Sequence, residues 1–287
     1  MSLRATLVAV LTVLLLSPAV PVAAHDASSA PADRRPSSRP PVSVRLASFN
    51  VLGSNHTMQS RSWHRGRTRA KIARRWLRNE GLSIVGLQEA QVDQLLVLTR
   101  KRWKAFPSPR HASNTETAQS VIWRRSRWRL LEAHTFTIPF ARGQHRKQPV
   151  VRLQNRRTDR QIWVISVHLS AREGARGNRD RRVGRARLVR EVRRLQPTRR
   201  PIVVTGDMNG HRRVFCAVTG KTRLVAASGG SNDADGCRTP SPMRVDWIFG
   251  SRGIEWKKFR YEDGGRLDAI TDHAVPVVTA TLGRRRR

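Results

Sequence analysis

Residues 202–210 read IVVTGDMNG, an apolar run that ends on a glycine and then meets an aspartate and an asparagine. The β-branched residues of such a run favour a buried strand. Side chains alternate between the two faces of a strand, so Asp207 and Asn209 lie on one face. Gly206 and Gly210 allow close backbone approach and a tight turn beside them. Because an unpaired buried carboxylate or amide is costly, this strand end predicts partners for both groups.

Other apolar segments carry polar residues in the same way, at or beside an end of the predicted strand. These residues are Asn50 in LASFN, Glu89 in IVGLQE, His168 in WVISVHLS, Asp246 in MRVDWIFG, and Asp272 and His273 in AITDHAVPVV. A single residue of this kind is commonly a turn residue or a helix cap. Several acids, an amide and two histidines together favour a polar site assembled where the strand ends meet.

Segments with helical periodicity are interleaved with the strand candidates. Apolar residues recur on one face and basic residues occupy the other, which predicts helices over residues 68–81, 90–101 and 182–196. The predicted strands span residues 44–52, 82–89, 120–125, 149–154, 161–170, 201–209, 243–250, 254–261 and 272–282. This mixture indicates an α/β or α+β fold, and its length suits one large core.

The N-terminal segment is typical of a secretory signal. Arg4 precedes an apolar run over residues 5–16, and the small residues at 22–24 suit cleavage before His25. The run is shorter than the roughly 20 residues that a membrane-spanning helix needs. We therefore expect a cleaved signal peptide over residues 1–24 and a secreted protein.

The rest of the chain divides by composition. Residues 25–42 are rich in Ala, Ser, Pro and Arg and are expected to form a disordered leader. A single domain is expected over residues 43–283, followed by a basic tail at residues 284–287. No segment after the signal is long and apolar enough to span a bilayer.

Cys216 and Cys237 are the two cysteines of the chain. An exported chain with an even cysteine count favours a disulfide between them. Closing a loop of about 20 residues would contribute roughly 3 kcal/mol on the chain-entropy estimate. A two-thiol zinc site is the alternative, but no CxxC motif or nearby histidine pair supports it.

The chain carries 56 Lys and Arg residues against 20 Asp and Glu, a formal charge of +36. Such an excess predicts attraction to polyanions, namely nucleic acid, anionic lipid or an acidic cell wall. Arginine greatly outnumbers lysine, so an arginine-rich solvated surface is an alternative explanation for part of the charge.

The segments SFNVL, GLQE, VHLS, GDMN, VDWIF and TDH, in this order, resemble the motifs of the endonuclease/exonuclease/phosphatase superfamily. This is the group of DNase I, apurinic endonucleases, neutral sphingomyelinases and inositol-polyphosphate 5-phosphatases. The resemblance covers residues 44–282. It implies two packed mixed β-sheets flanked by helices, a four-layer DNase I-like sandwich with the site at one end. It also implies hydrolysis of phosphoester bonds with a divalent metal, usually Mg²⁺, with Mn²⁺ and Ca²⁺ as alternatives.

The resemblance also implies a metal side of the site. Glu89 looks like the principal metal carboxylate, and oxygen ligands of this kind suit Mg²⁺. Asn50 and Asp272 resemble residues of the same metal shell. Asp207 resembles the acid that positions the attacking water or a metal, and Asn209 the amide that holds the phosphate or the nucleophile.

Two histidines complete the implied site. His273 resembles the histidine that contacts the phosphate and acts as, or orients, a general base. Asp246 resembles the acid that orients His273, and this pairing would raise the pKa of His273 above its usual value of about 6.5. His168 resembles the second histidine, which binds the scissile phosphate or assists the leaving group.

Substrate contacts are less well matched to the family pattern. The phosphate-contacting tyrosine of DNase-like nucleases has no counterpart between the Glu89 and His168 motifs, since the one tyrosine is Tyr261. Glu116 and Asn114 in SNTETAQS are candidate partners for His168. Arg146 and Lys147 in HRKQPVV are candidates for phosphate contact.

These features predict a secreted, monomeric, metal-dependent phosphodiesterase, a nuclease that hydrolyses DNA or RNA with little sequence preference. A sphingomyelinase-like or inositol-phosphate phosphodiesterase or phosphatase is the first alternative, because a basic face suits anionic lipid. No dense aromatic loop supports insertion into lipid. The second alternative, a non-catalytic basic nucleic-acid-binding protein, is disfavoured because each main motif retains its polar residue.

Overall fold

The computed structural model describes residues 39–283 of the chain. The expected signal peptide at residues 1–24, most of the leader at residues 25–42 and the basic tail at residues 284–287 lie outside this range. Within it, the first strand, β1, spans Val42–Asn50.

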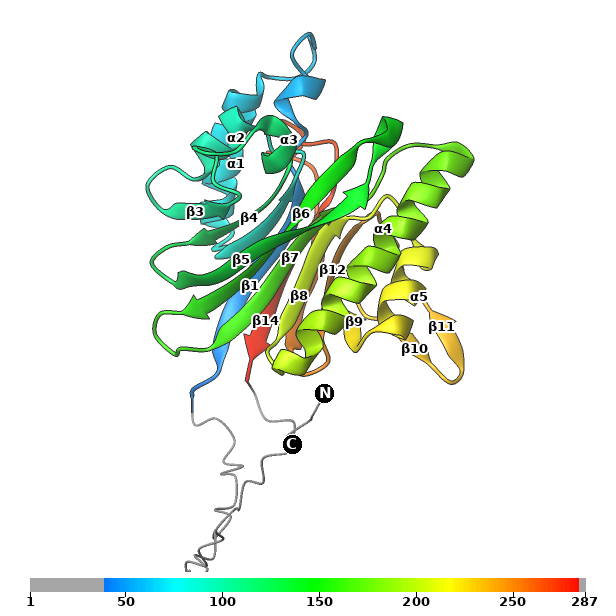
Figure 1. The fold of residues 1–287 in the computed structure, drawn as a ribbon. Coiled ribbons are helices and arrows are strands. Elements are labelled where there is room, and N and C mark those ends of the chain that lie inside the picture. Colours follow the sequence, from blue (N-terminus) through cyan, green and yellow to red (C-terminus); the bar gives the residue numbers. More distant parts are fainter. Residues whose placement is uncertain (1–38, 284–287) are drawn as a thin grey trace, which may run out of the picture. The chain divides into compact units, whose positions relative to one another are not determined.

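One six-stranded sheet, here the first sheet, has the order β13-β14-β1-β2-β4-β3 (Figure 1). It draws its strands from both ends of the described chain. Besides β1, they are β2 (Ile84–Gln88), β3 (Trp103–Phe106), β4 (Gln119–Arg124), β13 (Glu255–Glu262) and β14 (Val275–Leu282).

The second sheet is also six-stranded, with the order β5-β6-β7-β8-β12-β9. Its strands come from the middle of the chain. They are β5 (Trp128–Pro139), β6 (His145–Asn155), β7 (Gln161–His168), β8 (Ile202–Asp207), β9 (Leu224–Ala226) and β12 (Asp246–Ser251). The opening segment, IVVTGD, is the β8 strand, and it is buried along its whole length as a strand covered on both faces should be.

Strand register places the ends of several strands together. β1 and β2 run parallel with Asn50 opposite Gln88, and β7 and β8 run parallel with His168 opposite Asp207. β12 runs antiparallel to β8, with its first residue, Asp246, opposite Asp207. In each sheet, therefore, polar residues collect at one end of the central strands.

Helices cover the outer faces of both sheets. Ala73 and Leu77 of α1 (Gly66–Asn79), with α2 (Val92–Leu98), pack in the core cluster of the first sheet. On the second sheet, Leu188 of α4 (Gly174–Leu195) and Val214 of α5 (Arg212–Lys221) do the same. The short elements are η1 (Ser54–His56), α3 (Asn114–Thr117), η2 (Ala141–Gly143), η3 (Gln196–Thr198), β10 (Ser231–Asp233) and β11 (Gly236–Arg238).

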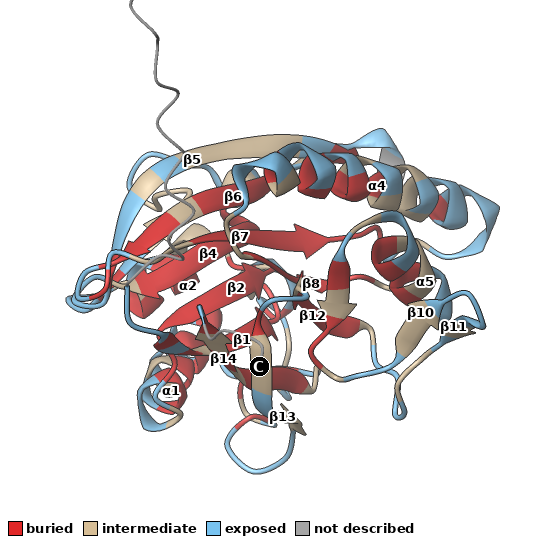
Figure 2. Ribbon diagram, turned by 90° about the horizontal axis from the view of Figure 1, so that it is seen from below, coloured by how far each residue is buried: buried red, intermediate tan, exposed pale blue. Residues whose placement is uncertain are grey.

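A third apolar cluster lies between the two sheets, so the domain has four layers. It brings Leu46 and Ile84 of the first sheet together with Val164 and Val203 of the second. Figure 2 shows the buried strands between helices whose outer faces are exposed. The expected four-layer sandwich of two mixed sheets flanked by helices is confirmed.

The two sheets lie close together at Gly86, beneath the cluster of polar strand ends. Gly86 of β2 faces Thr205 of β8, and a Cβ at position 86 would lie 1.8 Å from the Thr205 hydroxyl oxygen. A larger residue would separate the sheets there. The glycine thus brings the ends of β2 and β8 within side-chain reach of each other.

Helix α4 starts earlier than its apolar periodicity predicts, at Gly174 instead of residue 182. Its first turns are rich in Gly, Arg, Asn and Asp and show little amphipathic pattern. They are held instead by Arg181, which donates hydrogen bonds to the carbonyls of Ser170 (2.8 Å) and Arg172 (2.7 Å). Over residues 39–283, no helix combines the length and the apolar character needed to cross a membrane.

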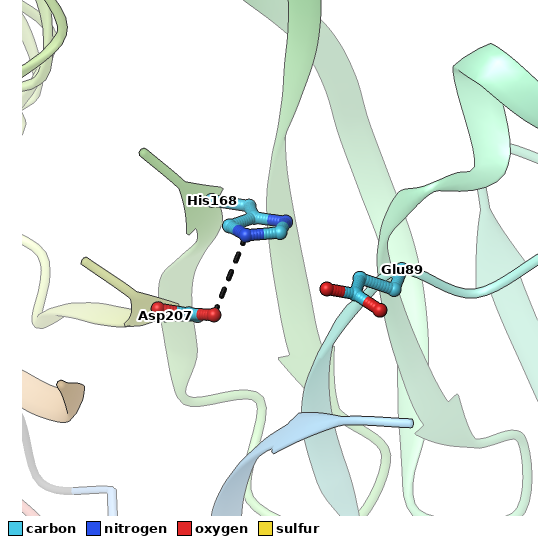
Figure 3. Close-up of side chains that lie close together, drawn as sticks. All are labelled: Glu89, His168 and Asp207. Atoms are coloured by element: carbon cyan, nitrogen blue, oxygen red, sulfur yellow. Dashed lines mark ion pairs between the residues drawn. The ribbon is translucent and has the colours of Figure 1, made fainter. Parts of the chain in front are cut away.

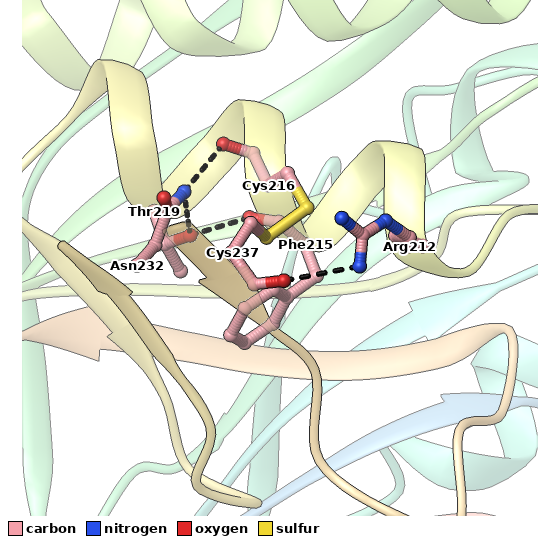
Figure 4. The surroundings of a disulfide bond; sticks show 6 residues. All are labelled: Arg212, Phe215, Cys216, Thr219, Asn232 and Cys237. Atoms are coloured by element: carbon pink, nitrogen blue, oxygen red, sulfur yellow. Dashed lines mark hydrogen bonds between the residues drawn. A yellow bond between two sulfur atoms is a disulfide. The ribbon is translucent and has the colours of Figure 1, made fainter. Parts of the chain in front are cut away.

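The predicted disulfide is present between Cys216 of α5 and Cys237 of β11, with a Cα–Cα distance of 5.8 Å (Figure 4). Hydrogen bonds reinforce the junction. Asn232 donates to the Cys216 carbonyl at 3.0 Å and to the Thr219 hydroxyl at 2.9 Å, and Arg212 donates to the Cys237 carbonyl at 3.0 Å. The bridge therefore attaches the β10–β11 hairpin to the helix that follows the GDMN segment.

Candidate active site

Asn50 links the two sheets at the polar end of the sandwich. Its side-chain nitrogen donates to Glu89 Oε1 at 3.0 Å and to Asp207 Oδ2 at 3.1 Å, and lies 3.4 Å from His273 Nε2. Its side-chain oxygen accepts a hydrogen bond from the Leu52 amide at 3.0 Å. Only 1% of Asn50 is exposed. A single buried amide therefore holds two carboxylates from different sheets beside each other.

Glu89 directly follows β2 and has a positive φ of 62°, which is uncommon outside glycine. Its Oε2 accepts a hydrogen bond from the Gly53 amide at 3.1 Å and lies 3.5 Å from His56 Nε2. Burial opposes ionisation of this carboxyl. The charge of His168 and the hydrogen bonds from Asn50 and Gly53 outweigh it and lower the pKa of Glu89, which keeps the group an anion.

His168 and Asp207 end neighbouring strands and face Glu89 across the site (Figure 3). His168 Nε2 lies 3.3 Å from Asp207 Oδ2, at ion-pair distance but outside hydrogen-bond geometry. His168 is 3% exposed, and neither of its ring nitrogens has a hydrogen-bond partner among the described residues. Its ring is held from behind by Phe140, with ring centroids 5.3 Å apart in an edge-to-face contact. A buried imidazole without a partner indicates a group built to meet a ligand.

Glu89, His168 and Asp207 suit a divalent cation. Each offers one ligand atom, and these atoms lie within 4.8 Å of one another. Asp207, Asp246 and His273 form a second set with the same property, so Asp207 belongs to both. Carboxylate oxygens are the ligands that Mg²⁺ and Mn²⁺ accept, and imidazole extends the range toward transition metals. With the unpaired nitrogens of His168, the donor set fits a bound metal.

His273 and Asp246 form a buried pair beside Asp207. His273 Nδ1 donates to Asp246 Oδ2 at 2.7 Å, which leaves Nε2 directed at Asp207 Oδ2, 3.8 Å away. Burial would lower the pKa of His273, but its hydrogen bond to Asp246 and the nearby carboxylates raise it to about 9. Burial raises the pKa of Asp246 to about 7. The pair therefore retains a proton through neutral pH.

Asn209 and Tyr261 support this arrangement from its edges. The backbone amide of Asn209 donates to Asp207 Oδ1 at 3.0 Å, and the side chain of Asn209 donates to the Leu169 carbonyl at 3.0 Å. Tyr261 donates to the Asp246 carbonyl at 3.2 Å. The lone tyrosine thus lies beside the His273 pair although it follows the other motifs in sequence.

Four predicted residues lie apart from these clusters. Asp272 is exposed and belongs to neither candidate metal set, although its charge helps to raise the pKa of His273. On α3, the Asn114 side chain accepts a hydrogen bond from the Val92 amide at 2.8 Å. Glu116 caps the same helix through Ser113 and pairs with Lys147 Nζ at 3.2 Å. Among the described contacts, none joins Asn114 or Glu116 to His168; its carboxylate neighbour is Asp207.

Arg146 lies on the side of the site that β6 provides. Its guanidinium carbon is 4.6 Å from the centroid of the Phe140 ring, and its Nε is buried without a partner in the described part of the chain. Burial lowers the pKa of Arg146, and the nearby charge of Glu89 opposes that effect. A guanidinium that feels the charge of Glu89 and has an unpartnered Nε is well placed to meet a phosphate.

Sequence reasoning missed Gln148, His56 and Phe140. The Gln148 side-chain oxygen accepts the His168 backbone amide at 2.8 Å and so fixes the end of β7. Gln148 belongs to the HRKQPVV segment already singled out for Arg146, and His56 follows the Asn50 motif closely. The available signal was that Gln148 and His56 lie close to these motifs in the sequence. Neither residue belongs to a motif of its own that indicates the site.

Comparisons with known proteins agree with this fold. The model of the Endonuclease/Exonuclease/phosphatase family matches residues 47–273. A protein of that family from Bacteroides thetaiotaomicron is similar in structure, with a TM-score of 0.68 at 15% identity over 87% of this chain and 100% of that one. No curated protein sequence matches the chain.

Two further solved structures have more specific names. The mannosyl-6-phosphatase of Bacteroides thetaiotaomicron gives a TM-score of 0.64 at 15% identity, over 83% of this chain and 98% of that one. The human Nocturnin catalytic domain, solved with a bound sulfate anion, gives 0.62 at 16%, over 84% and 97%. At these identities the structural likeness establishes the fold alone.

Proposed function

The chain belongs to the endonuclease/exonuclease/phosphatase family, a family of phosphoric-ester hydrolases, and from this premise we propose that it is a divalent-metal-dependent nuclease. Its substrate would be the backbone of DNA or RNA, read with little sequence preference. The observation that carries the proposal is the junction at Asn50, where Glu89 and Asp207 of different sheets meet beside two imidazoles. We extend the proposal to secretion and to action as a monomer.

Glu89, Asp207 and His168 are the residues that would hold the cation. A bound divalent cation would stabilise negative charge on the phosphate oxygens as a Lewis acid. The family is generally metal-dependent, and Mg²⁺ is our first candidate, with Mn²⁺ and Ca²⁺ as alternatives. Asn50 would keep the two carboxylates in place whether or not the metal is bound, since it donates to both.

Asp207 lies between two histidines, and this suggests a division of roles. Its Oδ2 is 3.3 Å from His168 Nε2 and 3.8 Å from His273 Nε2. Asp207 would orient the attacking water and accept its proton as the new P–O bond forms. The opposite P–O bond would break in line, and its oxygen would take a proton from an imidazole. His273, kept protonated by Asp246, would also donate a hydrogen bond to a non-bridging oxygen.

The positive charge of the chain favours a polyanionic substrate. A formal charge of +36 attracts nucleic acid through its phosphates and requires no particular base sequence. The similarity to a mannosyl-6-phosphatase makes a small phosphomonoester the alternative to be tested. The alternative of a lipid substrate is tested with sphingomyelin.

The deciding experiment compares four substrates with the purified protein: supercoiled plasmid, structured RNA, mannose 6-phosphate and sphingomyelin vesicles. Each is incubated with Mg²⁺, with EDTA, and with a Glu89→Gln variant, which keeps the shape of the side chain and removes its charge. We expect plasmid or RNA cleavage that EDTA abolishes and the variant lowers by at least a hundredfold (~2.7 kcal/mol). Hydrolysis confined to the monoester or the lipid would overturn the nuclease proposal.

A further inference from the structure

Arginines gather on α4 and α5 beside the candidate active site. Helix α4 follows the loop after His168, and α5 follows the loop that contains Asn209 (Figure 1). We use the name arginine ridge for the side chains of Arg181, Arg182, Arg185 and Arg213. On α4 these residues are spaced so that Arg181 and Arg182 each share a helix face with Arg185.

The ridge is fixed relative to the catalytic residues. Arg181 donates hydrogen bonds to the carbonyls of Ser170 and Arg172, in the loop that follows His168. Gly184 packs on the residue after His168, since a Cβ at position 184 would lie 2.8 Å from Leu169 Cδ2. The part of α4 that carries the ridge is therefore packed against the segment that follows His168.

The charges of the ridge repel one another. Arg185 is partly buried, which lowers its pKa, and the charges of Arg213, Arg181 and Arg182 lower it further. In residues 39–283, none of the four reaches ion-pair distance of a carboxylate. Like charges held together without a counter-charge cost free energy, and a bound polyanion would relieve that cost.

We propose that the arginine ridge holds the part of a nucleic-acid strand that continues beyond the scissile phosphate. This inference rests on the proposed nuclease function and names the path of its substrate. Guanidinium groups bind phosphates through paired hydrogen bonds and require no particular base. The carboxylates of the catalytic site repel a polyanion, so adjacent cations are needed to retain the strand there.

The ridge matters only for a substrate longer than one phosphate. A phosphomonoester or a small diester would be held at the catalytic residues and would end before α4. Removal of the ridge should therefore weaken cleavage of polymers far more than cleavage of a small diester. A selective loss of polymer cleavage would distinguish arginines that bind the substrate from arginines that are merely solvated.

The chain supplies a matched control at the far end of the molecule. Arg124 ends β4, whose first residue, Gln119, pairs with Gln88 at the site. Burial lowers the pKa of Arg124, and the charges of Arg127, Arg102 and Arg78 lower it further, as their counterparts do for Arg185. The test variant is R182Q/R185Q/R213Q and the control is R78Q/R102Q/R127Q. Arg181 is kept because it supports the loop.

Binding is measured with a labelled oligonucleotide of mixed sequence, in a Glu89→Gln background and across a range of salt concentrations. Removing one arginine–phosphate interaction should make the slope of log affinity against log salt shallower by about 1, so the slope of the test variant should fall by about 2 to 3. The slope of the control should fall by less than about 1. The variant R182K/R185K/R213K keeps the charge and should recover most of the slope, whereas a folding defect would not be rescued.

Activity is measured in the active background with plasmid or RNA and with bis(p-nitrophenyl) phosphate. The ratio of polymer cleavage to small-diester cleavage should fall at least tenfold in the test variant and stay within about twofold in the control. Equal losses in test and control variants would overturn the inference in favour of bulk charge. Unchanged polymer cleavage in the test variant would overturn it too. Wild-type protein that cleaves only small esters would instead overturn the nuclease function itself.

Discussion

His273 shows how one residue of the site depends on its neighbours. Its Nδ1 is occupied by Asp246, and its Nε2 is directed at Asp207 and Asn50. The hydrogen bond fixes which nitrogen points into the site, and the negative surroundings keep the ring protonated to a pKa of about 9. A histidine in this state serves as a cation and a proton donor at neutral pH.

Asp246→Asn should lower the pKa of His273 from about 9 toward its ordinary value of 6.5. Burial, which lowers the pKa, is unchanged in the variant, and the hydrogen bond and charge of Asp246, which raise it most, are lost; Asp207 and Asp272 still raise it. In the wild type, this proton stabilises the fold fully below pH 6.5, and the contribution is lost as pH rises through about 9. NMR titration of ¹³C-labelled histidine measures both values. The same pKa in wild type and variant would contradict the assignment of this pair.

At the scale of elements, the buried central strands were predicted well, and so was the partly exposed β13, whereas the edge strands β3, β5 and β9 were missed. The segments that became β7 and β8 are buried apolar runs, and their sequences are unambiguous. The edge strand β5 has mixed exposure over Trp128–Pro139 and was not predicted. Helix α5 was missed as well, because its ten residues, which include a cysteine and a glycine, are a short window for a periodic pattern.

The site was predictable where a side chain ends a buried strand. Asn50, His168 and Asp207 end strands, Glu89 directly follows β2, and strand register brings the four together. Asp272 lies between elements, where nothing in a strand pattern fixes the direction of a side chain. Partnerships between strands, such as that of the Gln148 side chain on β6 with the backbone of His168 on β7, depend on tertiary packing and have no local signal.

Arg69 of α1 connects elements that flank the site. It is fully buried and donates to the carbonyls of Val51 (2.8 Å) and Ile270 (2.9 Å) and to the Thr57 hydroxyl (2.8 Å). Arg69→Met should lower the free energy of unfolding by about 3 kcal/mol or more, since these buried acceptors lose their donor. Urea denaturation measures the loss. Arg67→Met, an exposed position on the same helix, is the control, and equal effects would contradict this role.

The disulfide stabilises the element that follows the GDMN segment. Replacing Cys216 and Cys237 by serine should lower the free energy of unfolding by roughly 3 kcal/mol, mainly because the unfolded chain gains freedom. Denaturation of wild type with and without a reductant gives the same comparison without mutation. If the reductant left the free energy of unfolding of the wild type unchanged, this result would contradict the disulfide.

The whole molecule carries far more positive than negative charge, and the charge is concentrated at more than one place. One cluster surrounds Arg185 beside the site, and another surrounds Arg124 at the opposite end of β4. Such self-repulsion opposes the compact state. The fold must be held by its three apolar clusters against this repulsion.

Salt should therefore raise the melting temperature. Between about 20 and 200 mM NaCl the screening length falls severalfold, and the repulsion between exposed arginines falls with it. Differential scanning fluorimetry measures the shift, with sodium perchlorate at equal ionic strength to separate screening from specific anion effects. A melting temperature that falls with salt would show that ion pairs outweigh the repulsion.

The pairing of Val42 with Leu282 at the outer ends of β1 and β14 has a practical consequence. Both ends of the domain leave it side by side, and β1 then runs the length of the sheet before it reaches Asn50. A bead, a surface or a fused carrier joined directly at Val42 or Leu282 would therefore lie at the end of the sheet opposite Asn50. Copies immobilised in this way would all present the candidate site to the solution.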